Sequence, residues 1–467
     1  MKIVISFGLG IKIYDSLPQT IQGIIGKILA PIPLSWRGHR GVFNLAERIS
    51  EPITIDELNQ KESEALSELV RHAYENVPYY RDLFSEKKID PRDVRCITDL
   101  KNLPILTKSD VRKNGSELIA SDAKKYSPGK VRTSGSTGEP LEFLIDQRTR
   151  LSEYAAEWRC ILENDGEIGG KTATFRGNYY RNHRKVGASW FRHALSGDLI
   201  FNTFSMDEET CRKYISKLRS FEPEIFRAFP SSLSHLARFV DGGKINEHAI
   251  AFCSSEMMSK EMEDLIQTRI CNTVINWYSQ SEYVLSAGTC REGNMHINSE
   301  FGIIEVLDEE GKPVPDGTVG RLVGTSLTNF SQPFIRYDLD DLGAISETRC
   351  KCGRPHRILQ RISGRHSDLI VTPDDRTLST VQMQHWWKHQ AVKEWDLDHF
   401  DWIQLIQTDI CSFRILVVSK SGVESQNYHE NMEMALSDLW GTEVSVSIQD
   451  LDTMPHGEKW RFSKSEI

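Results

Sequence analysis

The feature that most constrains this chain is a loop of hydroxyl residues and glycines between two strand-like segments. Residues 133–140 read Thr-Ser-Gly-Ser-Thr-Gly-Glu-Pro and precede an apolar run over residues 141–145. Such a loop can turn several backbone N–H groups and hydroxyls towards one anion, because glycine allows close approach and unusual dihedral angles. It is not a Walker loop, since no Gly-Lys-Ser/Thr ends it. A surface turn rich in serine and glycine would have the same local sequence. The rest of the chain is therefore needed to distinguish an anion-binding loop from a surface turn.

Composition bounds the class of protein. The 467 residues allow two or three domains with a large core. The net charge of −9 argues against a general nucleic-acid binder, which would carry a basic face. Nine scattered cysteines do not indicate a disulfide framework, so a reducing cytoplasm is the expected location.

The amino-terminal segment is apolar but short. Lys12 and Asp15 follow the apolar run at residues 3–11, and no small-residue cleavage pattern appears, so we expect no signal peptide. Isoleucines recur at helical spacing over residues 21–28, in a run too short to span a bilayer. We expect this run to pack on the main body, and peripheral membrane contact is the alternative.

The pattern along the chain predicts an α/β protein with two parts. Residues 54–90 and 148–162 read as helical, with a short connector and helix over 99–113, and apolar runs then alternate with helical patterns to about residue 290. The run at 274–278 predicts a buried strand with Glu282 beyond its carboxyl end, where ligands collect in such sheets. Residues 303–327 predict a β-meander. A smaller α+β unit follows about Gly364, with strands at 403–406, 413–418 and 444–448 and a helix at 428–439.

The loop at 133–140 resembles the phosphate-binding loop of adenylate-forming enzymes, and four further motifs of that superfamily follow in order. Residues 278–282 (Tyr-Ser-Gln-Ser-Glu) are similar to its aromatic-x-x-Ser/Thr-Glu motif, and residues 336–341 (Arg-Tyr-Asp-Leu-Asp-Asp) to its ribose-binding motif. Residues 364–368 (Gly-Arg-His-Ser-Asp) resemble the interdomain hinge, and residues 455–461 the segment with the catalytic lysine. Residues 72–81 and 103–108 resemble the phenylacetate–CoA ligase-like branch, which includes CapK-like capsule-cluster proteins. The resemblance covers nearly the whole chain.

The resemblance implies a fold and an activity. The fold would be a large multi-layer domain over residues 1–363, with doubly wound sheets and a β-meander, and a small mobile α+β domain over 364–467. The activity would be that of an AMP-forming ligase, which uses ATP and Mg²⁺ to activate a small carboxylic acid as acyl-adenylate. CoA is the leading acceptor, and an amine on a sugar, peptide or carrier is the alternative. A nucleotide-binding partner without catalysis is a third reading.

The resemblance also assigns roles to individual residues. Thr137, Glu282 and Lys459 would be catalytic, with Glu282 holding Mg²⁺ and Lys459 bridging the substrate carboxylate and the α-phosphate. Tyr278 would stack on adenine, and Asp341 would accept hydrogen bonds from the ribose hydroxyls. The remaining nucleotide contacts would be Thr133, Ser134, Gly135, Ser136, Gly138, Ser255, Glu256, Ser281 and Arg365.

The motifs leave alternative residues for some roles and differ from the family pattern at some positions. Asp338 and Asp340 compete with Asp341 for the ribose role, although the following Leu342 favours Asp341. Leu141 follows Pro140 where many family loops carry a lysine, so one cationic phosphate contact is missing. One residue is inserted before Lys459 relative to the commoner spacing. If Lys459 is only a tail lysine, Lys464 is the next candidate.

A second group of residues has the chemistry of a metal site. Cys290, His296, Cys350 and Cys352 offer three thiolates and an imidazole, which suit a closed tetrahedral Zn²⁺ site. The spacing is looser than in a zinc finger, and His356 is a rival ligand. Unliganded reduced cysteines are the alternative. A bound zinc would be structural, because four protein ligands leave no open position. The substrate acid and the oligomeric state cannot be read from the sequence.

Overall fold

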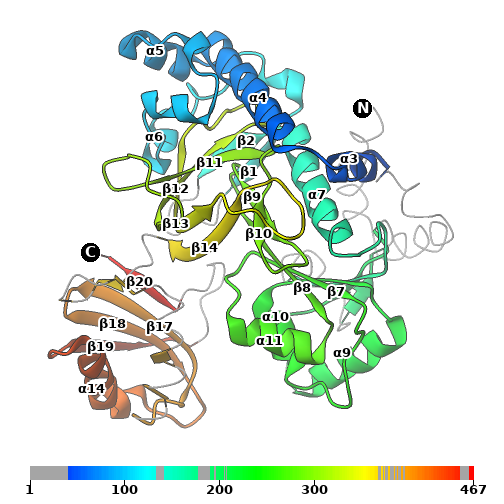
Figure 1. Cartoon of the computed structure of the whole chain (residues 1–467). Helices are drawn as coiled ribbons and strands as arrows, with labels where there is room; N and C mark the ends of the chain where they lie inside the picture. Colours follow the sequence, from blue (N-terminus) through cyan, green and yellow to red (C-terminus); the bar gives the residue numbers. More distant parts are fainter. Residues whose placement is uncertain are drawn as a thin grey trace.

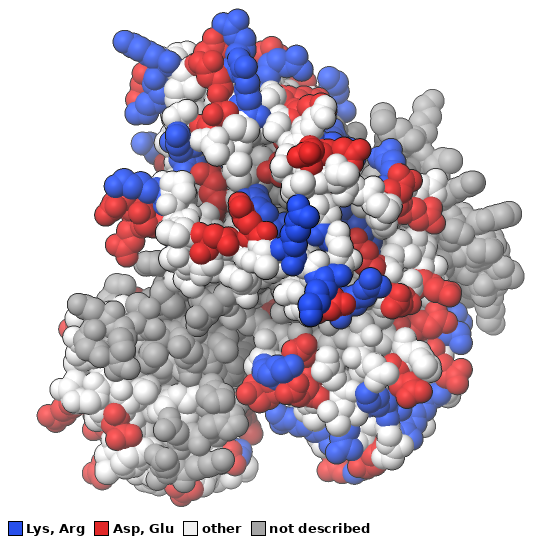
Figure 2. Space-filling view, in the orientation of Figure 1, with Lys and Arg blue, Asp and Glu red and all other residues white. Residues whose placement is uncertain are grey.

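The computed structural model describes residues 40–132, 141–176, 190–193, 196–203, 206, 208–365, 370–371, 373, 377–378, 383, 386–387, 391–392, 395–452 and 462–466. Figure 1 shows one large sheet flanked by helices and a smaller sheet with its own helix towards the carboxyl terminus. No helix in these ranges is both long and apolar enough to cross a membrane. Figure 2 shows acidic and basic side chains interspersed over the visible face.

Four helices come first in the described part of the chain. These are α3 (Arg40–Ser50), α4 (Ile55–Asn76), α5 (Pro78–Lys87) and α6 (Lys108–Lys113). The prediction of continuous helix over 54–90 is wrong at one point, because the helix breaks at Val77. Val77 is extended (φ −113°, ψ 114°), as expected for a residue before proline. Thr54 and Glu57 form a capping box that fixes the start of α4.

The large sheet has a parallel half, as the alternating pattern predicts. Strands β3 (Thr172–Phe175), β5 (Leu199–Phe201), β6 (Ile225–Ala228), β7 (Ile250–Ser254) and β8 (Thr273–Ser279) run parallel, with β4 (Trp190–Arg192) antiparallel at the edge. Helices α9 (Glu208–Phe221), α10 (Pro230–Ala237) and α11 (Lys260–Arg269) pack on one face, which presents alternate residues such as Phe226 and Ala251. The other face, with Ile225 and Phe252, packs against α3 and α7 (Gln147–Leu162). The sheet is therefore covered on both faces.

The other half of the sheet is an antiparallel meander. It contains β9 (Ser286–Thr289), β10 (Met295–Ile297), β11 (Gly302–Leu307), β12 (Gly320–Ser326), β13 (Tyr337–Ser346) and β14 (Ile358–Arg365). The full strand order is β11-β12-β13-β14-β10-β9-β8-β7-β6-β3-β5-β4. Strand β8 joins the two halves, because it pairs parallel with β7 and antiparallel with β9.

A separate hairpin precedes the large sheet. Strands β1 (Gly129–Arg132) and β2 (Glu142–Ile145) pair antiparallel, with Arg132 opposite Glu142. The hairpin is anchored through Asp146, whose buried carboxylate accepts hydrogen bonds from Phe330 N and Ser331 N at 2.7 and 3.1 Å.

The carboxyl-terminal part has a sheet and a core of its own. Strands β17 (Phe400–Asp409), β18 (Ser412–Ser419), β19 (Ser445–Asp450) and β20 (Ser463–Ser465) are covered by α14 (His429–Trp440). Two short strands, β15 (Ile370–Val371) and β16 (Thr377–Leu378), pair antiparallel nearby. This α+β unit matches the predicted strands and helix.

Candidate active site

Tyr278 and Asp341, which come from motifs far apart in the sequence, touch each other. Tyr278 lies near the carboxyl end of β8 and Asp341 lies on β13. The tyrosine hydroxyl donates a hydrogen bond of 2.5 Å to Asp341 Oδ2. The structure therefore places the predicted adenine-stacking and ribose-binding residues side by side, and the phenol orients the carboxylate.

A bulge in β13 separates Asp341 from its two rivals. The register between β12 and β13 shifts over this segment, and Asp340 has a positive φ of 60°. Asp338 pairs with Arg321 at 3.1 Å, and Asp340 pairs with Lys108 at 3.6 Å. The two rival carboxylates thus have cationic partners, and Asp341 is the one that contacts Tyr278.

Arg365 is brought to the same place by strand pairing. It lies at the end of β14, and its backbone is directly opposite Asp341 in the antiparallel ladder with β13. The side chain of Arg365 lies outside what the structure describes. The ladder still puts the start of the predicted hinge beside the predicted ribose site.

Glu282 is buried, with 8% of its surface exposed. It follows β8 in a turn closed by a hydrogen bond from Tyr283 N to Gln280 O at 3.1 Å. The hydroxyl of Tyr337 donates to Glu282 Oε1 at 3.1 Å. Burial and the neighbouring carboxylate raise the pKa of Tyr337, so this hydroxyl stays a donor. The carboxylate of Glu282 is therefore fixed by a hydrogen bond and lies beyond the carboxyl end of a parallel strand. A carboxylate is a ligand type that Mg²⁺ prefers.

The remaining predicted nucleotide contacts differ in their surroundings. Ser255 follows β7 with a positive φ of 73°, in a tight turn beside the end of β8. Glu256 accepts a hydrogen bond from Ser231 N at 3.2 Å, so its carboxylate caps the amino end of α10. Ser281 is exposed. Thr133, Ser134, Gly135, Ser136, Thr137, Gly138 and Lys459 lie outside the described residues.

The four predicted zinc ligands converge. The ligand atoms of Cys290, His296, Cys350 and Cys352 all lie within 4.8 Å of one another. The sulfurs of Cys290 and Cys350 are 3.8 Å apart, and Cys352 Sγ is 3.3 Å from His296 Nε2. A tetrahedral site with Zn–S bonds of ~2.3 Å has sulfur–sulfur edges of about 3.8 Å. The donor set and its spacing therefore fit Zn²⁺.

The surroundings favour the metal-binding forms of His296 and Cys350. His296 shares a 3.0 Å hydrogen bond with the His356 carbonyl through Nδ1, which leaves Nε2 facing the cysteines. Burial lowers the pKa of His296 to about 4, so the imidazole is neutral. Burial disfavours the Cys350 thiolate, but donors from Cys352 N and Asn294 outweigh it and lower the pKa of Cys350. The rival His356 instead contacts Glu300 at 3.1 Å through Nε2.

Two side-chain contacts of the motif at 336–341 were not predicted from the sequence. Tyr337 lies inside the recognised motif at 336–341, but nothing in the sequence places its hydroxyl on Glu282. Arg336 is buried and forms a two-point pair with Glu305, with both distances at 2.9 Å. Its positive φ of 52° shows that the turn before β13 is held in a strained conformation.

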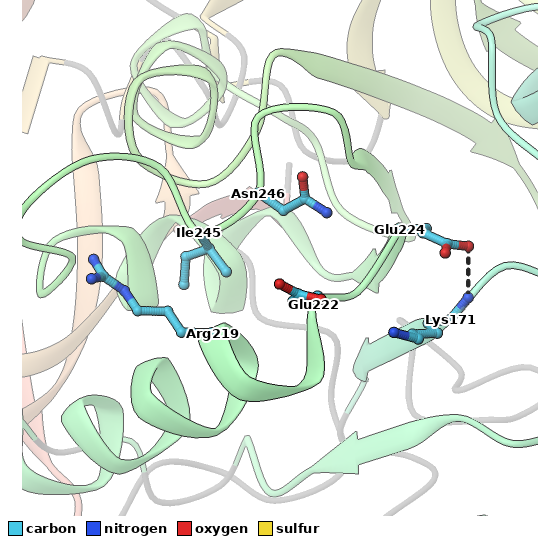
Figure 3. A pocket seen from close by; sticks show the side chains of 6 residues that line it. All are labelled: Lys171, Arg219, Glu222, Glu224, Ile245 and Asn246. Carbon is cyan, nitrogen blue, oxygen red and sulfur yellow. Dashed lines mark hydrogen bonds between the residues drawn. The ribbon is translucent and has the colours of Figure 1, made fainter.

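One groove lies away from these residues. Figure 3 shows it lined by Lys171, Arg219, Glu222, Glu224, Ile245 and Asn246, with a volume of about 280 Å³. Lys171 and Glu224 immediately precede β3 and β6. The groove is therefore at the amino ends of the parallel strands, opposite to the predicted site.

Comparison with known proteins gives relatives along most of the chain. Phenylacetate–coenzyme A ligase of Pseudomonas putida is 28% identical over 333 residues, covering 69% of this chain and 73% of that protein. Protein CapK of Staphylococcus aureus is 22% identical over 465 residues, covering 97% of this chain and 99% of that protein. No protein-family model matches the chain.

Over most of its length the chain is similar to members of the adenylate-forming superfamily. Within this superfamily, its relatives are those of the phenylacetate–CoA ligase and CapK-like branch. A solved 2-hydroxyisobutyryl-CoA ligase in complex with 2-HIB-AMP has the same fold, with a TM-score of 0.61 at 17% identity over 87% of this chain and 89% of that one. These likenesses confirm the predicted family, the predicted fold class and the prediction of a ligase-type enzyme.

Proposed function

We propose that this chain activates a carboxylic acid with ATP, releases pyrophosphate, and transfers the acyl group of the resulting adenylate to CoA. The observation that carries the proposal is the contact between Tyr278 and Asp341 beside the buried Glu282. These two residues come from motifs about 60 positions apart, and the resemblance assigns both of them to the nucleotide, which supports the proposal. The names of the phenylacetate–CoA ligase relatives support CoA as the acceptor.

The residues would act mainly by positioning. Attack of a carboxylate on a phosphate needs charge neutralisation and alignment more than it needs a protein nucleophile. Asp341 would accept hydrogen bonds from the ribose hydroxyls, with its orientation fixed by Tyr278. Glu282, held by Tyr337, would bind Mg²⁺, and the ion would neutralise phosphate charge when present. Lys459 would supply the cation at the reacting carboxylate.

We also propose that Cys290, His296, Cys350 and Cys352 hold a structural Zn²⁺. Cys290 follows β9 and His296 lies on β10, while Cys350 and Cys352 lie in the connection from β13 to β14. Four protein ligands complete the coordination, so the zinc would link the β9–β10 hairpin to the β13–β14 connection and take no part in the reaction.

An acid panel tests the proposed reaction. Purified protein with ATP and Mg²⁺ should release pyrophosphate and AMP in the presence of its acid, and CoA should yield a thioester. Formation of ADP and phosphate would contradict the proposal. Acyl product with a sugar or peptide amine, and none with CoA, would replace CoA by the amine acceptor.

A further inference from the structure

The connection between β12 and β13 is buried along its whole length. It covers residues 327–335, which form neither helix nor strand, and every one of them is buried. Connections usually run over the surface, because a buried one leaves backbone N–H and C=O groups that need partners inside the protein. A buried connection therefore depends on side chains that supply these partners and fix its course.

Two amide side chains of the connection bind strand β2. Asn329 Nδ2 donates to the Leu144 carbonyl at 3.0 Å, and Gln332 Oε1 accepts from Leu144 N at 2.8 Å. Asn329 Oδ1 also accepts from Asp146 N at 3.0 Å. Asn329 and Gln332 are 1% and 2% exposed. Because both backbone groups of Leu144 are paired with side chains, the connection holds β2 as a neighbouring strand would.

Helices α4 and α5 hold the same connection. The hydroxyl of Tyr80 on α5 donates to the Pro333 carbonyl at 3.0 Å and accepts from Ile335 N at 3.1 Å. His72 on α4 shares a hydrogen bond of 2.9 Å with the Phe330 carbonyl through Nε2. The position of the connection is therefore set by β2 together with both helices.

Phe334 joins this connection to the predicted Mg²⁺ ligand. Its ring stacks on Tyr337, with ring centres 4.9 Å apart and planes inclined by 18°. The ring of Phe143 on β2 lies 5.6 Å from Phe334, centre to centre. All three rings are buried, and the Tyr337 hydroxyl donates to Glu282 Oε1 at 3.1 Å. A continuous series of contacts therefore runs from β2 through Phe334 and Tyr337 to Glu282.

The orientation of Glu282 matters because Mg²⁺ requires near-ideal octahedral geometry. A carboxylate that is already directed by a neighbouring donor is a better ligand than one that turns freely. Protein interiors are close-packed, so the position of one buried ring restricts the position of the next. Removing the ring of Phe334 would release Tyr337 on the side away from its hydroxyl, and the hydrogen bond to Glu282 would loosen.

We propose that Phe334 is a positioning residue that acts through Tyr337, holding the tyrosine hydroxyl on Glu282 and so directing the carboxylate towards the magnesium of bound ATP. The inference rests on the proposed function. It adds to that function a residue that lies in none of the recognised motifs, since Phe334 precedes the motif at 336–341.

Nucleotide binding tests the inference without the acid and without turnover. Calorimetry measures the dissociation constant of α,β-methylene-ATP in the presence of Mg²⁺ and, separately, of EDTA, and the ratio of the two constants is the gain in affinity due to the metal. Phe334→Leu should lower this gain about three- to tenfold, which is the size expected for a buried aromatic pair. Tyr337→Phe should lower it by a similar factor, because it removes the hydrogen bond to Glu282.

A double-mutant cycle shows whether Phe334 acts through Tyr337. The double variant Phe334→Leu/Tyr337→Phe should lose no more of the gain than Tyr337→Phe alone, because without the hydroxyl the stacked ring has nothing to position. Phe226→Leu is the control. Phe226 is fully buried on β6 in the core beneath α9, α10 and α11, so this variant should lower the Tm and leave the gain unchanged. Additive losses in the double variant would refute action through Tyr337.

A milder variant covers the case in which Phe334→Leu does not fold. Phe334→Met also removes the stacked ring and keeps more of its volume. An unchanged gain in a folded Phe334 variant would overturn the inference. Failure of the proposed function would look different, because wild-type protein would then bind the nucleotide neither with Mg²⁺ nor with EDTA.

Discussion

At the residue scale, the structure separates three aspartates that the sequence leaves in competition. Asp338 and Asp340 have cationic partners, whereas Asp341 contacts Tyr278. Local sequence cannot make this distinction, because the bulge in β13 decides where each side chain points. The partners that matter lie on β8, β12 and α6, far away along the chain.

The aspartates give a direct test. Asp341→Asn should raise the KM for ATP and lower kcat/KM by about 10- to 100-fold, because a carboxylate is a much stronger acceptor for ribose hydroxyls than an amide. Asp338→Asn is the matched control and should have little effect, since it loses only a partly exposed pair with Arg321. Steady-state kinetics with varied ATP checks both. Equal losses in the two variants would show that Asp341 has no special role.

The raised pKa of Glu153 predicts a pH effect on stability. The group faces Glu157 on its own helix, Arg176 beyond β3, Ser279 on β8 and Tyr283 in the loop that follows. A glutamate with a raised pKa in the folded state binds a proton there that the unfolded chain has lost. Its contribution to stability therefore falls as pH rises from about 4.5 to about 8. The loss is at most ~1.4 kcal/mol per pH unit.

Thermal unfolding of Glu153→Gln measures this contribution. The variant lacks the titrating group, so its Tm relative to wild type should increase between pH 6 and pH 8. Asp198, whose pKa burial raises to about 6, is present in both proteins and cancels in the comparison. Parallel Tm curves over this range would show that Glu153 is already ionised at pH 6.

At the element scale, the regular elements follow closely from sequence pattern and the contacts between them do not. The predicted helix at 148–162 is α7, and the predicted strand at 274–278 is β8. Their apolar spacing is local information. The predicted single helix over 54–90 is wrong because Pro78 imposes an extended Val77. The ion pair between Glu157 on α7 and Arg227 on β6 was not predicted, because it depends on which strand faces which turn of α7.

The zinc proposal belongs to this scale, because the metal would join elements. Cys290 and His296 lie at the β9–β10 hairpin, and Cys350 and Cys352 in the β13–β14 connection. Metal analysis should find about one Zn²⁺ per chain. Removing the zinc with a chelator should lower the Tm by several degrees, because the free energy of metal binding adds to the stability of the folded state. Cys352→Ser should lower both zinc content and Tm. Cys271→Ser, at a buried cysteine outside the group, is the control for zinc content. Protein made with zinc available that contains none would contradict the proposal.

At the scale of the whole molecule, the described chain holds one sheet before the predicted hinge and another after it. Strand β14 ends at Arg365, and the next large sheet begins at Phe400 on β17. Figure 1 shows the smaller sheet with α14 set apart from the large one. The division at residues 363 and 364, and a mobile second domain, stay predictions. Such a domain would carry Lys459 towards and away from the site that Tyr278, Glu282 and Asp341 define.

This arrangement predicts that Lys459 serves one half of the reaction. Lys459→Ala should slow adenylate formation by about 100-fold or more, because it removes a charge contact made mainly in the transition state. The second step, started from synthetic acyl-adenylate, should change little, because the lysine would have moved away before the acceptor attacks. Pre-steady-state measurement of pyrophosphate release and of thioester formation separates the two steps.

Lys464 provides the matched control for this experiment. It lies on β20, and its Nζ is 3.6 Å from Glu466, so it already has a partner within the small sheet. Lys464→Ala should therefore leave both half-reactions near wild type. If Lys464→Ala instead loses adenylation and Lys459→Ala retains it, the residue inserted before Lys459 has shifted the motif, and the catalytic cation comes from β20. Equal loss of both half-reactions in Lys459→Ala would argue against a moving domain, because a lysine that stays in place would affect the rate of each step.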